Sequence, residues 1–391
     1  MKAYIRHVWH SILRGDWILL ILCLFTTGFG CLAIASATNY MGSTNYVLTQ
    51  IFAAVIGIIF YALASSVDLE FLSENRRWLV IINLFLLALL IPFGVTINGN
   101  RSWIDLRILP MNIQVAEVCK IFFIVILASV MNSHQRRISN PKSVLHMACH
   151  MLLIVGVNMV LSGDLGVSLI FAAIFLGMAI GGGVSILWFL GGIVLVAAVG
   201  PFVYNNFLGE YQKLRIEVLF NPDLDPLGRG PRYHTVQSLK SLTGGGMTGQ
   251  GLFSGRRTQG MDTLFARHTD YIYSSIGEEM GFVGCICVLV LLLAIVARII
   301  WVGMRSPDYM RKLVCFGAAS AMIFQIIVNV GMCMGVMPVI GLTLPFISYG
   351  GSSLVTTYLM LGLVSGVYAR PRPSSHERYI RPPYMAAPRL Q

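Results

Sequence analysis

The chain has 391 residues, of which 56% are hydrophobic and only 12% are charged. A soluble domain carries about 25% charged residues, so this composition excludes an ordinary soluble protein and indicates a polytopic membrane protein. The formal net charge of +11 does not indicate nucleic-acid binding, because the basic residues lie scattered between apolar runs without interleaved aromatic residues.

Ten segments of about 20 mostly apolar residues are each long enough to cross a bilayer as a helix. They lie near residues 17–38, 47–66, 78–96, 114–132, 144–161, 165–182, 184–204, 271–300, 313–335 and 346–369. We therefore predict an all-α polytopic membrane protein. Residues 1–369 would form a bundle of ten transmembrane helices, and residues 370–391 a flexible, basic cytoplasmic tail.

Lys and Arg residues predict the orientation of these spans, because basic loops are retained on the cytoplasmic side. With the N-terminus inside, the inside segments carry seventeen Lys and Arg residues, whereas the short outside loops carry only Arg101 and Arg107. We therefore expect the protein to lie in the plasma membrane of the cell. Both of its termini would be in the cytoplasm. Residues 205–270, between spans seven and eight, would form one large extracytoplasmic loop.

This long loop shows no clear helical pattern in its sequence. Its glycine-rich stretch "SLKSLTGGGMTGQG" is not a Walker phosphate loop, because no GK[ST] follows it. We expect an irregular segment that folds back on the membrane surface, where Lys240, Arg256 or Arg257 could meet an anionic headgroup. A plain flexible loop is the alternative, although loops of this length are more often functional.

Two polar groups lie at the predicted outer ends of spans four and five. Glu117 and Lys120 are three residues apart at the start of a helix, so they can pair on one face. This pair is either a structural ion pair or part of a polar cavity within the membrane. Asp164, in the short turn "SGDLG", is more simply interpreted as a turn-forming residue.

Asp270 ends the long loop within "RHTDYIYSSIGEEMGF" and precedes span eight. A carboxylate at this position could simply cap the helix. Against that role, Glu278 follows about two turns later on nearly the same face, and Glu279 adds a second buried carboxylate. The small residues of span eight form a stripe along which another helix can approach closely: Ser274, Gly277, Gly281 and Gly284.

A segment broken by Pro and Gly, "MPVIGLTLPFISYGGSSL", enters span ten from the outside. Irregular backbone at this depth is tolerated only where it is buried in protein or lines a cavity. Together with the preceding groups, it predicts a polar cleft, open to the outside, between the ends of spans four, eight and ten.

The order and spacing of these motifs resemble the SEDS family, the RodA, FtsW and SpoVE proteins of bacterial cell-wall synthesis. The motifs are "GNRSWI", "QVAEVCK", "GDLG", "NPDLDPLGRG", "QSLKSLTGGGMTGQG", "RHTDYIYSSIGEEMGFVG" and "MPVIGLTLPFISYGGSS". The resemblance covers essentially the whole chain. It implies a peptidoglycan glycosyltransferase that polymerises lipid II into glycan strands at the outer face of the cytoplasmic membrane. It also implies a class B penicillin-binding protein as transpeptidase partner.

The resemblance places the family's essential aspartate on Asp270. The chain departs from the family pattern in three motifs: "QVAE" replaces QPSE, "SGDLG" replaces EPDLG, and Ala266 stands where the family has an acidic residue. The lack of long tails and the wording of the last motif favour a RodA-like over an FtsW-like protein. The substrate-binding residues that we expect are Arg101, Trp103, Glu117, Lys120, Arg267, His268, Ser348, Tyr349, Gly350, Gly351 and Ser352.

Polymerisation would proceed by attack of a sugar hydroxyl on the anomeric carbon of a second lipid-linked unit, with inversion. One base is enough for this displacement, and Asp270 is the best-placed candidate. The eight cysteines show no metal-ligand pairing such as CxxC, so neither a metal site nor a cofactor is evident. Positive side chains would then neutralise the leaving pyrophosphate, and a divalent ion could share that work.

Two other functions fit a many-helix bundle. A transporter of the same lipid would need a polar path across the whole membrane, whereas the charges gather toward the outer face and the main other polar pair is Gln325 and Asn329. A non-catalytic scaffold for the transpeptidase would leave the polar residues around Asp270 without a task.

Overall fold

The computed structural model describes residues 14–97, 100–105, 110–207, 209–225, 230, 232–260, 264 and 266–369. The expected tail and Arg107 lie outside these residues.

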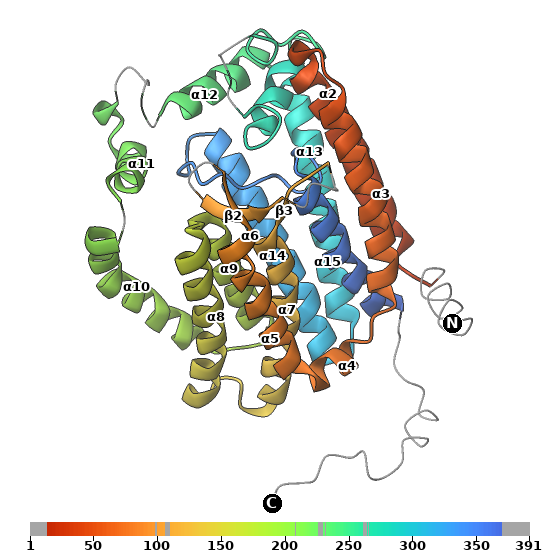
Figure 1. Ribbon diagram of the computed structural model, residues 1–391, viewed down its shortest axis with the longest axis vertical. Coiled ribbons are helices and arrows are strands. Elements are labelled where there is room, and N and C mark those ends of the chain that lie inside the picture. The colour runs from red at the N-terminus through yellow and green to blue at the C-terminus, as the bar shows by residue number, and fades with distance from the viewer. Residues whose placement is uncertain are drawn as a thin grey trace, which may run out of the picture.

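Long helices that run alongside one another form most of the molecule (Figure 1). Within the described residues, nine helices are long and apolar enough to cross a membrane, and the expected sixth span is a shorter apolar helix, Leu165–Gly181. The predicted fold class is confirmed, while the number of ten crossings stays a prediction. The helices are α2 (Trp17–Thr38), α3 (Asn45–Ser65), α4 (Leu69–Glu74), α5 (Arg76–Ala88), α6 (Leu90–Phe93), α7 (Val115–Ser133), α8 (Pro141–Ser162), α9 (Leu165–Gly181), α10 (Ile186–Phe207), α11 (Glu210–Phe220), α12 (Tyr233–Gly245), α13 (Ile272–Arg305), α14 (Tyr309–Cys333) and α15 (Gly351–Ala369), with 3₁₀ turns η1 (Asn39–Met41), η2 (Gln135–Arg137) and η3 (Pro222–Leu224).

Helices α7 and α15 form the centre of the bundle, since 83% of the apolar window of each is buried. Lipid tails are as apolar as the side chains, so close backbone packing, rather than the hydrophobic effect, holds such helices together. Helix α15 meets this requirement against α3: a Cβ on Gly362 or Gly366 would overlap the α3 backbone at Tyr61 or Ser65. Glycine at these positions therefore lets the two helices touch.

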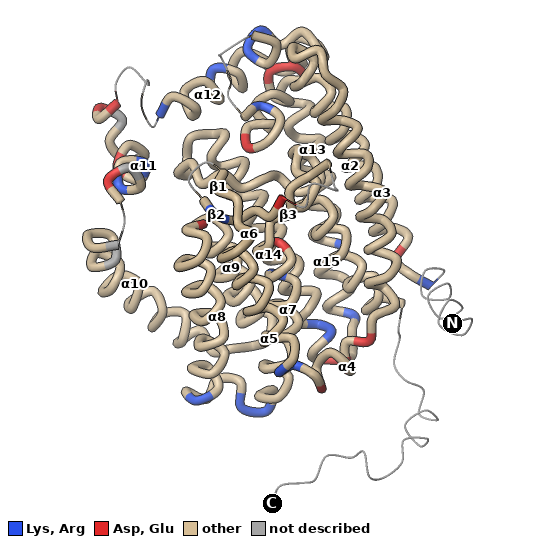
Figure 2. Tube along the Cα trace, viewed as in Figure 1, with Lys and Arg blue, Asp and Glu red and all other residues tan. Residues whose placement is uncertain are grey.

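Charged residues are concentrated at the two ends of the bundle, and the tube between them is mostly uncharged (Figure 2). The end that carries α4 and the turn between α7 and α8 is rich in Lys and Arg (Figure 2). This separation is the pattern from which we predict that end to be cytoplasmic.

A small antiparallel sheet, which the sequence did not predict, connects α6 with α7. Its strands are β1 (Gly94–Ile97), β2 (Asn100–Ile104) and β3 (Ile113–Gln114), in the order β1-β2-β3. Trp103 pairs with Val95 on one side and with Gln114 on the other. The sheet satisfies the backbone of this connection and brings Gln114 to the first turn of α7.

The prediction that the long loop lacks helices is wrong, because it contains α11 and α12. Helix α12 is rich in Ser, Thr and Gly, so its own sequence signal is weak, and packing against α13 stabilises it. The Oγ atoms of Ser238 and Ser274 lie 2.5 Å apart, and a Cβ on Gly245 would overlap the backbone of Gly277. The expected close approach of a helix to the small-residue stripe is confirmed at these positions.

Helix α13 is broken at Gly281, whose φ of 68° lies in the left-handed region. The break removes the helical partners of two carbonyl oxygens and two amides. Residues 246–251 replace them: the amides of Gln250 and Gly251 donate to the carbonyl oxygens of Glu278 and Glu279 at 2.9 and 3.0 Å. In return, the amides of Phe282 and Val283 donate to the carbonyl oxygens of Gly246 and Met247 at 2.9 and 3.2 Å.

We predict that Gly281→Ala destabilises the protein by about 1–3 kcal/mol, because a left-handed φ is strained for alanine. A Cβ would also overlap the backbone of Met247 and Gly249. The thermal unfolding temperature in detergent should fall. The control is Gly28→Ala, since a Cβ on Gly28 meets nothing within 4 Å; equal unfolding temperatures of the two variants would contradict the prediction.

Candidate active site

Asp270 lies immediately before α13 but does not cap it. The N-cap residue is Tyr271, and no side chain caps the helix. Among the described residues, the Asp270 carboxylate has no hydrogen-bond or ion-pair partner. Its Oδ2 faces Gly341 of the broken segment, 3.6 Å from where a Cβ on that glycine would lie. The structure therefore removes the capping interpretation, and no described residue engages the carboxylate.

Burial raises the pKa of Asp270 to about 6. Surrounding protein displaces water from the carboxylate and so disfavours its charged form. A base works best when its pKa lies near the operating pH, because it is then both ionised and basic enough to take a proton. The environment of Asp270 is thus suited to general-base chemistry.

Four hydrogen bonds hold the backbone of residues 268–270 and of the broken segment beside this carboxylate. Asn329 of α14 donates through Nδ2 to the carbonyl oxygens of Asp270 at 2.9 Å and Leu342 at 2.7 Å. Ser348 Oγ donates to the carbonyl oxygen of Thr269 at 2.7 Å. The Tyr349 amide donates to the carbonyl oxygen of His268 at 2.8 Å. The expected convergence of span eight and the broken segment is confirmed by these contacts.

Gln50 of α3 extends this anchoring and was missed in the sequence. Its Nε2 donates to the Ser348 carbonyl oxygen, and its Oε1 accepts from the Gly350 amide, both at 3.2 Å. The side chain is fully buried. A polar side chain in the second turn of an apolar span was the available signal, because such residues are costly in a membrane and face the bundle interior.

Arg267 points into the long loop. Its guanidinium donates to the carbonyl oxygens of Arg257, Thr258 and Gly260 at 3.3, 2.5 and 2.8 Å. It also stacks on the ring of Tyr40 at 3.9 Å. These contacts make Arg267 a brace for the loop that leads to Asp270, and its expected binding to substrate stays a prediction.

The carboxylates of Glu278 and Glu279 also serve this loop. Glu278 accepts from the Arg257 amide at 2.9 Å and from the amide and hydroxyl of Thr258 at 2.8 and 2.7 Å. Glu279 accepts from Gln259 Nε2 at 2.9 Å, and its other oxygen accepts from Ser36 Oγ. Apart from Ser36 of α2, these partners are loop residues. The two carboxylates therefore do not extend the Asp270 group along the helix, as their spacing had suggested.

A second polar group lies at the start of α7. Lys120 Nζ pairs with Glu117 Oε2 at 2.5 Å, as the spacing predicted, and both side chains are buried. Thr356 Oγ1 of α15 donates to the same oxygen at 3.0 Å. Ser352 Oγ accepts from the Gln114 amide at 3.0 Å. The ends of spans four and ten therefore meet here, as expected.

Asp164 connects this second group to the broken segment. It caps α9 by accepting from the Val167 amide at 3.1 Å, which agrees with a turn-forming role. Its other oxygen accepts from Ser102 Oγ and Gln114 Nε2, both at 3.3 Å. A Cβ on the neighbouring Gly166 would touch the Ile340 and Leu342 side chains. The broken segment thus passes between the Asp164 group and Asp270.

Comparison with known proteins identifies the family. Residues 16–372 match the family model for FtsW, RodA and SpoVE, which is described as "Cell cycle protein". The chain belongs to this family. It is 30% identical over 365 residues to the peptidoglycan glycosyltransferase MrdB of Escherichia coli K12, covering 92% of this chain and 95% of that protein. It is 31% identical over 367 residues to the probable peptidoglycan glycosyltransferase FtsW of Trichlorobacter lovleyi, covering 90% and 93%.

Solved structures agree with this assignment to the FtsW/RodA/SpoVE family. The rod shape determining protein RodA of Thermus thermophilus superposes with a TM-score of 0.67 at 27% identity, covering 90% of this chain and 96% of that one. A chain from a study of polymerization and crosslinking by a peptidoglycan synthase complex superposes with a TM-score of 0.77 at 29% identity, covering 94% and 99%. This family member is thus a multi-pass membrane protein.

The other expected site residues of this FtsW/RodA/SpoVE chain are distributed around the same end. Arg101 is exposed and donates to the carbonyl oxygens of Ile91 at 2.6 Å and Gly94 at 3.2 Å. Trp103 lies in the central strand of the sheet. Gly351 packs so closely on the Met111 side chain that a Cβ would overlap its sulfur. In the described part of the chain, no group of three or more His, Cys, Asp or Glu could hold a metal.

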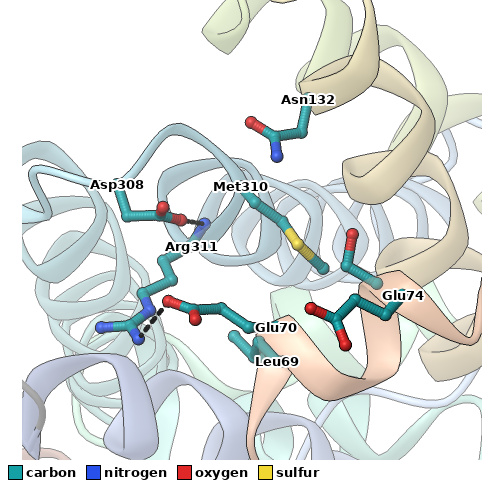
Figure 3. Close-up of a pocket in the computed structure, with 8 residues that line it drawn as sticks. Leu69, Glu70, Glu74, Asn132, Asp308, Met310 and Arg311 are labelled. Atoms are coloured by element: carbon teal, nitrogen blue, oxygen red, sulfur yellow. Dashed lines mark hydrogen bonds and ion pairs between the residues drawn. The ribbon is translucent and has the colours of Figure 1, made fainter. Parts of the chain in front are cut away.

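A pocket also occurs at the opposite end of the bundle, where α4 meets the start of α14 (Figure 3). Arg311 pairs there with Glu70 at 3.4 Å, and Asp308 accepts from the Arg311 amide at 2.8 Å. Its other lining residues are Leu69, Ser73, Glu74, Asn132 and Met310 (Figure 3). This pocket is separate from the cleft that the sequence predicted, because α13 and α14 each cross the bundle between Asp270 and Arg311.

We predict that Asn329→Ala destabilises the protein by about 1–3 kcal/mol, because the carbonyl oxygens of Asp270 and Leu342 lose their amide donor. Hydrogen exchange should rise in the segments around Thr269 and Leu342. The matched control is Asn83→Ala: Asn83 is equally buried, but neither of its side-chain polar atoms has a partner in the described structure. Equal losses for the two variants would show that the Asn329 hydrogen bonds contribute nothing.

Proposed function

We propose that this chain is a peptidoglycan glycosyltransferase that polymerises lipid II, with Asp270 as its general base. The observation that supports this role is a half-buried carboxylate whose environment raises its pKa and which has no partner among the described residues, on a backbone that Asn329 and Ser348 hold in place. The type of reaction, glycosyl transfer in peptidoglycan synthesis, is inferred from membership of the family and from the names of the relatives MrdB and FtsW.

The reaction is a single displacement at the anomeric carbon of a lipid-linked sugar. A hydroxyl oxygen of the second lipid-linked unit forms the new bond, the bond to the lipid pyrophosphate breaks on the opposite face, and the configuration inverts. The hydroxyl proton passes to the Asp270 carboxylate. General-base assistance of this kind contributes typically about 10² to 10⁴ in rate, provided that the base lies within hydrogen-bond reach of the hydroxyl.

The departing pyrophosphate needs positive charge. Lys120 is paired with Glu117, and the guanidinium groups of Arg101 and Arg267 bind carbonyl oxygens. Lys240 and Arg256 of the long loop are exposed, and we propose that they neutralise the leaving group. A divalent cation carried by the pyrophosphate itself could share this work.

We also propose that the reaction takes place at the outer face of a bacterial cytoplasmic membrane, with both termini inside. The distribution of Lys and Arg supports this orientation. The crosslinking partner would be a class B penicillin-binding protein, because the structural neighbour comes from a complex of polymerization and crosslinking. Lipid II, the growing glycan strand and membrane lipid would be the other partners, with 1–369 as the membrane domain and 370–391 as a basic tail. A RodA-like role in cell elongation or shape is the more specific form of this proposal.

A transporter of the same lipid is less well supported. Transport would require polar side chains along a path between the two membrane faces. Asn329, which with Gln325 forms the main polar pair of α14, instead holds the backbone of Asp270 and Leu342. The charged residues otherwise gather near the two ends (Figure 2).

We predict that Asp270→Asn abolishes glycan polymerisation from lipid II, because an amide cannot accept the hydroxyl proton. The variant should keep its unfolding temperature, since burial already disfavours the charged carboxylate. Polymer length and amount are measured with purified protein and its transpeptidase. Asp308→Asn, at the other end of the bundle, is the control and should polymerise normally. Full polymer from Asp270→Asn would remove the general-base assignment.

We further predict that polymerisation slows as the pH falls through about 6, because the pKa of Asp270 is raised to about 6 and only the ionised carboxylate accepts a proton. Between pH 7 and 8 the carboxylate is mostly ionised, so the rate should be nearly constant. Below the pKa, the initial rate should fall about tenfold per pH unit. A rate that is flat between pH 5 and 8, or that rises on acidification, would contradict a base of this kind.

A further inference from the structure

Three aromatic rings meet beside Asp270 although they come from distant parts of the chain. Tyr46 lies in the first turn of α3, His268 lies two residues before Asp270, and Tyr349 lies just before α15. The Tyr46 ring centroid is 4.9 Å from that of His268 and 5.1 Å from that of Tyr349, and the third pair is 5.8 Å apart. We call these three rings the aromatic trio.

The backbone of the trio is fixed relative to Asp270. The Tyr349 amide donates to the His268 carbonyl oxygen at 2.8 Å, and the neighbouring Ser348 Oγ binds the Thr269 carbonyl oxygen at 2.7 Å. Two residues of extended chain span at most about 7 Å, so His268 cannot lie further than this from Asp270 along the backbone. A hydroxyl group of a sugar that rests on the trio can therefore approach the Asp270 carboxylate.

The trio is not sealed inside the bundle. All three residues are half-buried, so the trio as a whole keeps some accessible surface. His268 Nδ1 is buried and has no hydrogen-bond partner in the described structure. Burial and the Arg267 charge lower the pKa of His268 to about 4, so the imidazole is neutral at pH 7. A neutral ring offers an apolar face together with one donor and one acceptor nitrogen.

These properties match the chemistry of a pyranose ring. One face of such a sugar carries C–H groups, which pack on the electron-rich face of an aromatic ring, and its rim carries hydroxyl and amide groups that seek hydrogen bonds. A pocket that combines aromatic surface with a few placed polar atoms is typical of small-molecule sites. We propose that the trio of Tyr46, His268 and Tyr349 is the platform on which the acceptor sugar of lipid II stacks.

The platform would orient the sugar so that its attacking hydroxyl faces Asp270. Orientation of this kind removes rotational freedom before the reaction and so lowers the barrier. The assignment rests on the proposed function, because it names how the substrate of that function is held. The competing explanation is that the three rings only pack the outer ends of α3 and α15 together.

The test measures binding, not turnover, in the inactive Asp270→Asn background. The affinities of the full-length protein for lipid II and for undecaprenyl pyrophosphate, which carries no sugar, are measured for Tyr46→Ala and Tyr349→Ala. Each substitution should weaken lipid II binding about tenfold, in line with the loss of one stacking contact, and change undecaprenyl pyrophosphate binding less than twofold. Tyr46→Phe and Tyr349→Phe keep the rings and should bind lipid II normally.

Two results would overturn the platform. Unchanged lipid II affinity in both alanine variants would show that the rings do not touch the sugar. An equal loss for both lipids would show that the rings act only through the packing of the bundle. Failure of the general-base assignment appears separately, as polymer made by Asp270→Asn, and failure of the glycosyltransferase assignment appears as wild-type protein that makes no polymer.

Discussion

The site depends on a break in one helix. Gly281 interrupts α13 and removes the helical partners of two carbonyl oxygens and two amides, and in apolar surroundings such groups must find other partners. Residues 246–251 satisfy all four. The same hydrogen bonds that repair the helix therefore fasten the long loop to the bundle, so its glycines serve a structural purpose there.

From this fastening, a chain of contacts leads to Asp270. Glu278 and Glu279, just before the break, bind the turn that contains Thr258 and Gln259. Carbonyl oxygens of that turn hold the guanidinium of Arg267. On the other side, Asn329, Ser348 and Gln50 bind the backbone of the broken segment or of residues 269–270. Within the described residues, the carboxylate thus has no partner while its backbone is held from both sides, which is how a preorganised catalytic group is built.

Local spacing predicted some parts of this arrangement and not others. The Glu117–Lys120 pair was predictable because residues three apart share a helix face. The approach of the broken segment to Asp270 was predictable because irregular backbone inside a membrane must be buried in protein or line a cavity. The roles of Glu278 and Glu279 were not predictable, because their partners lie about 20 residues away in a loop whose path no periodicity reveals. Helix α12 was missed for the same reason, since its stability comes from contact with the stripe on α13.

The composition and spacing of the sequence predicted the membrane bundle, the motifs of the family and ten apolar segments. Nine helices long and apolar enough to cross a membrane occur among the described residues. These are properties of single segments, and a bilayer selects segments one at a time by length and polarity. Only the tertiary structure decided which polar side chains have hydrogen-bond partners among the described residues and which do not. Arg267 and Asp270 stand three residues apart. Loop carbonyl oxygens bind the Arg267 guanidinium, whereas the Asp270 carboxylate has no partner in the described structure. That difference depends on where distant backbone atoms lie, because a hydrogen bond requires a partner within about 3 Å.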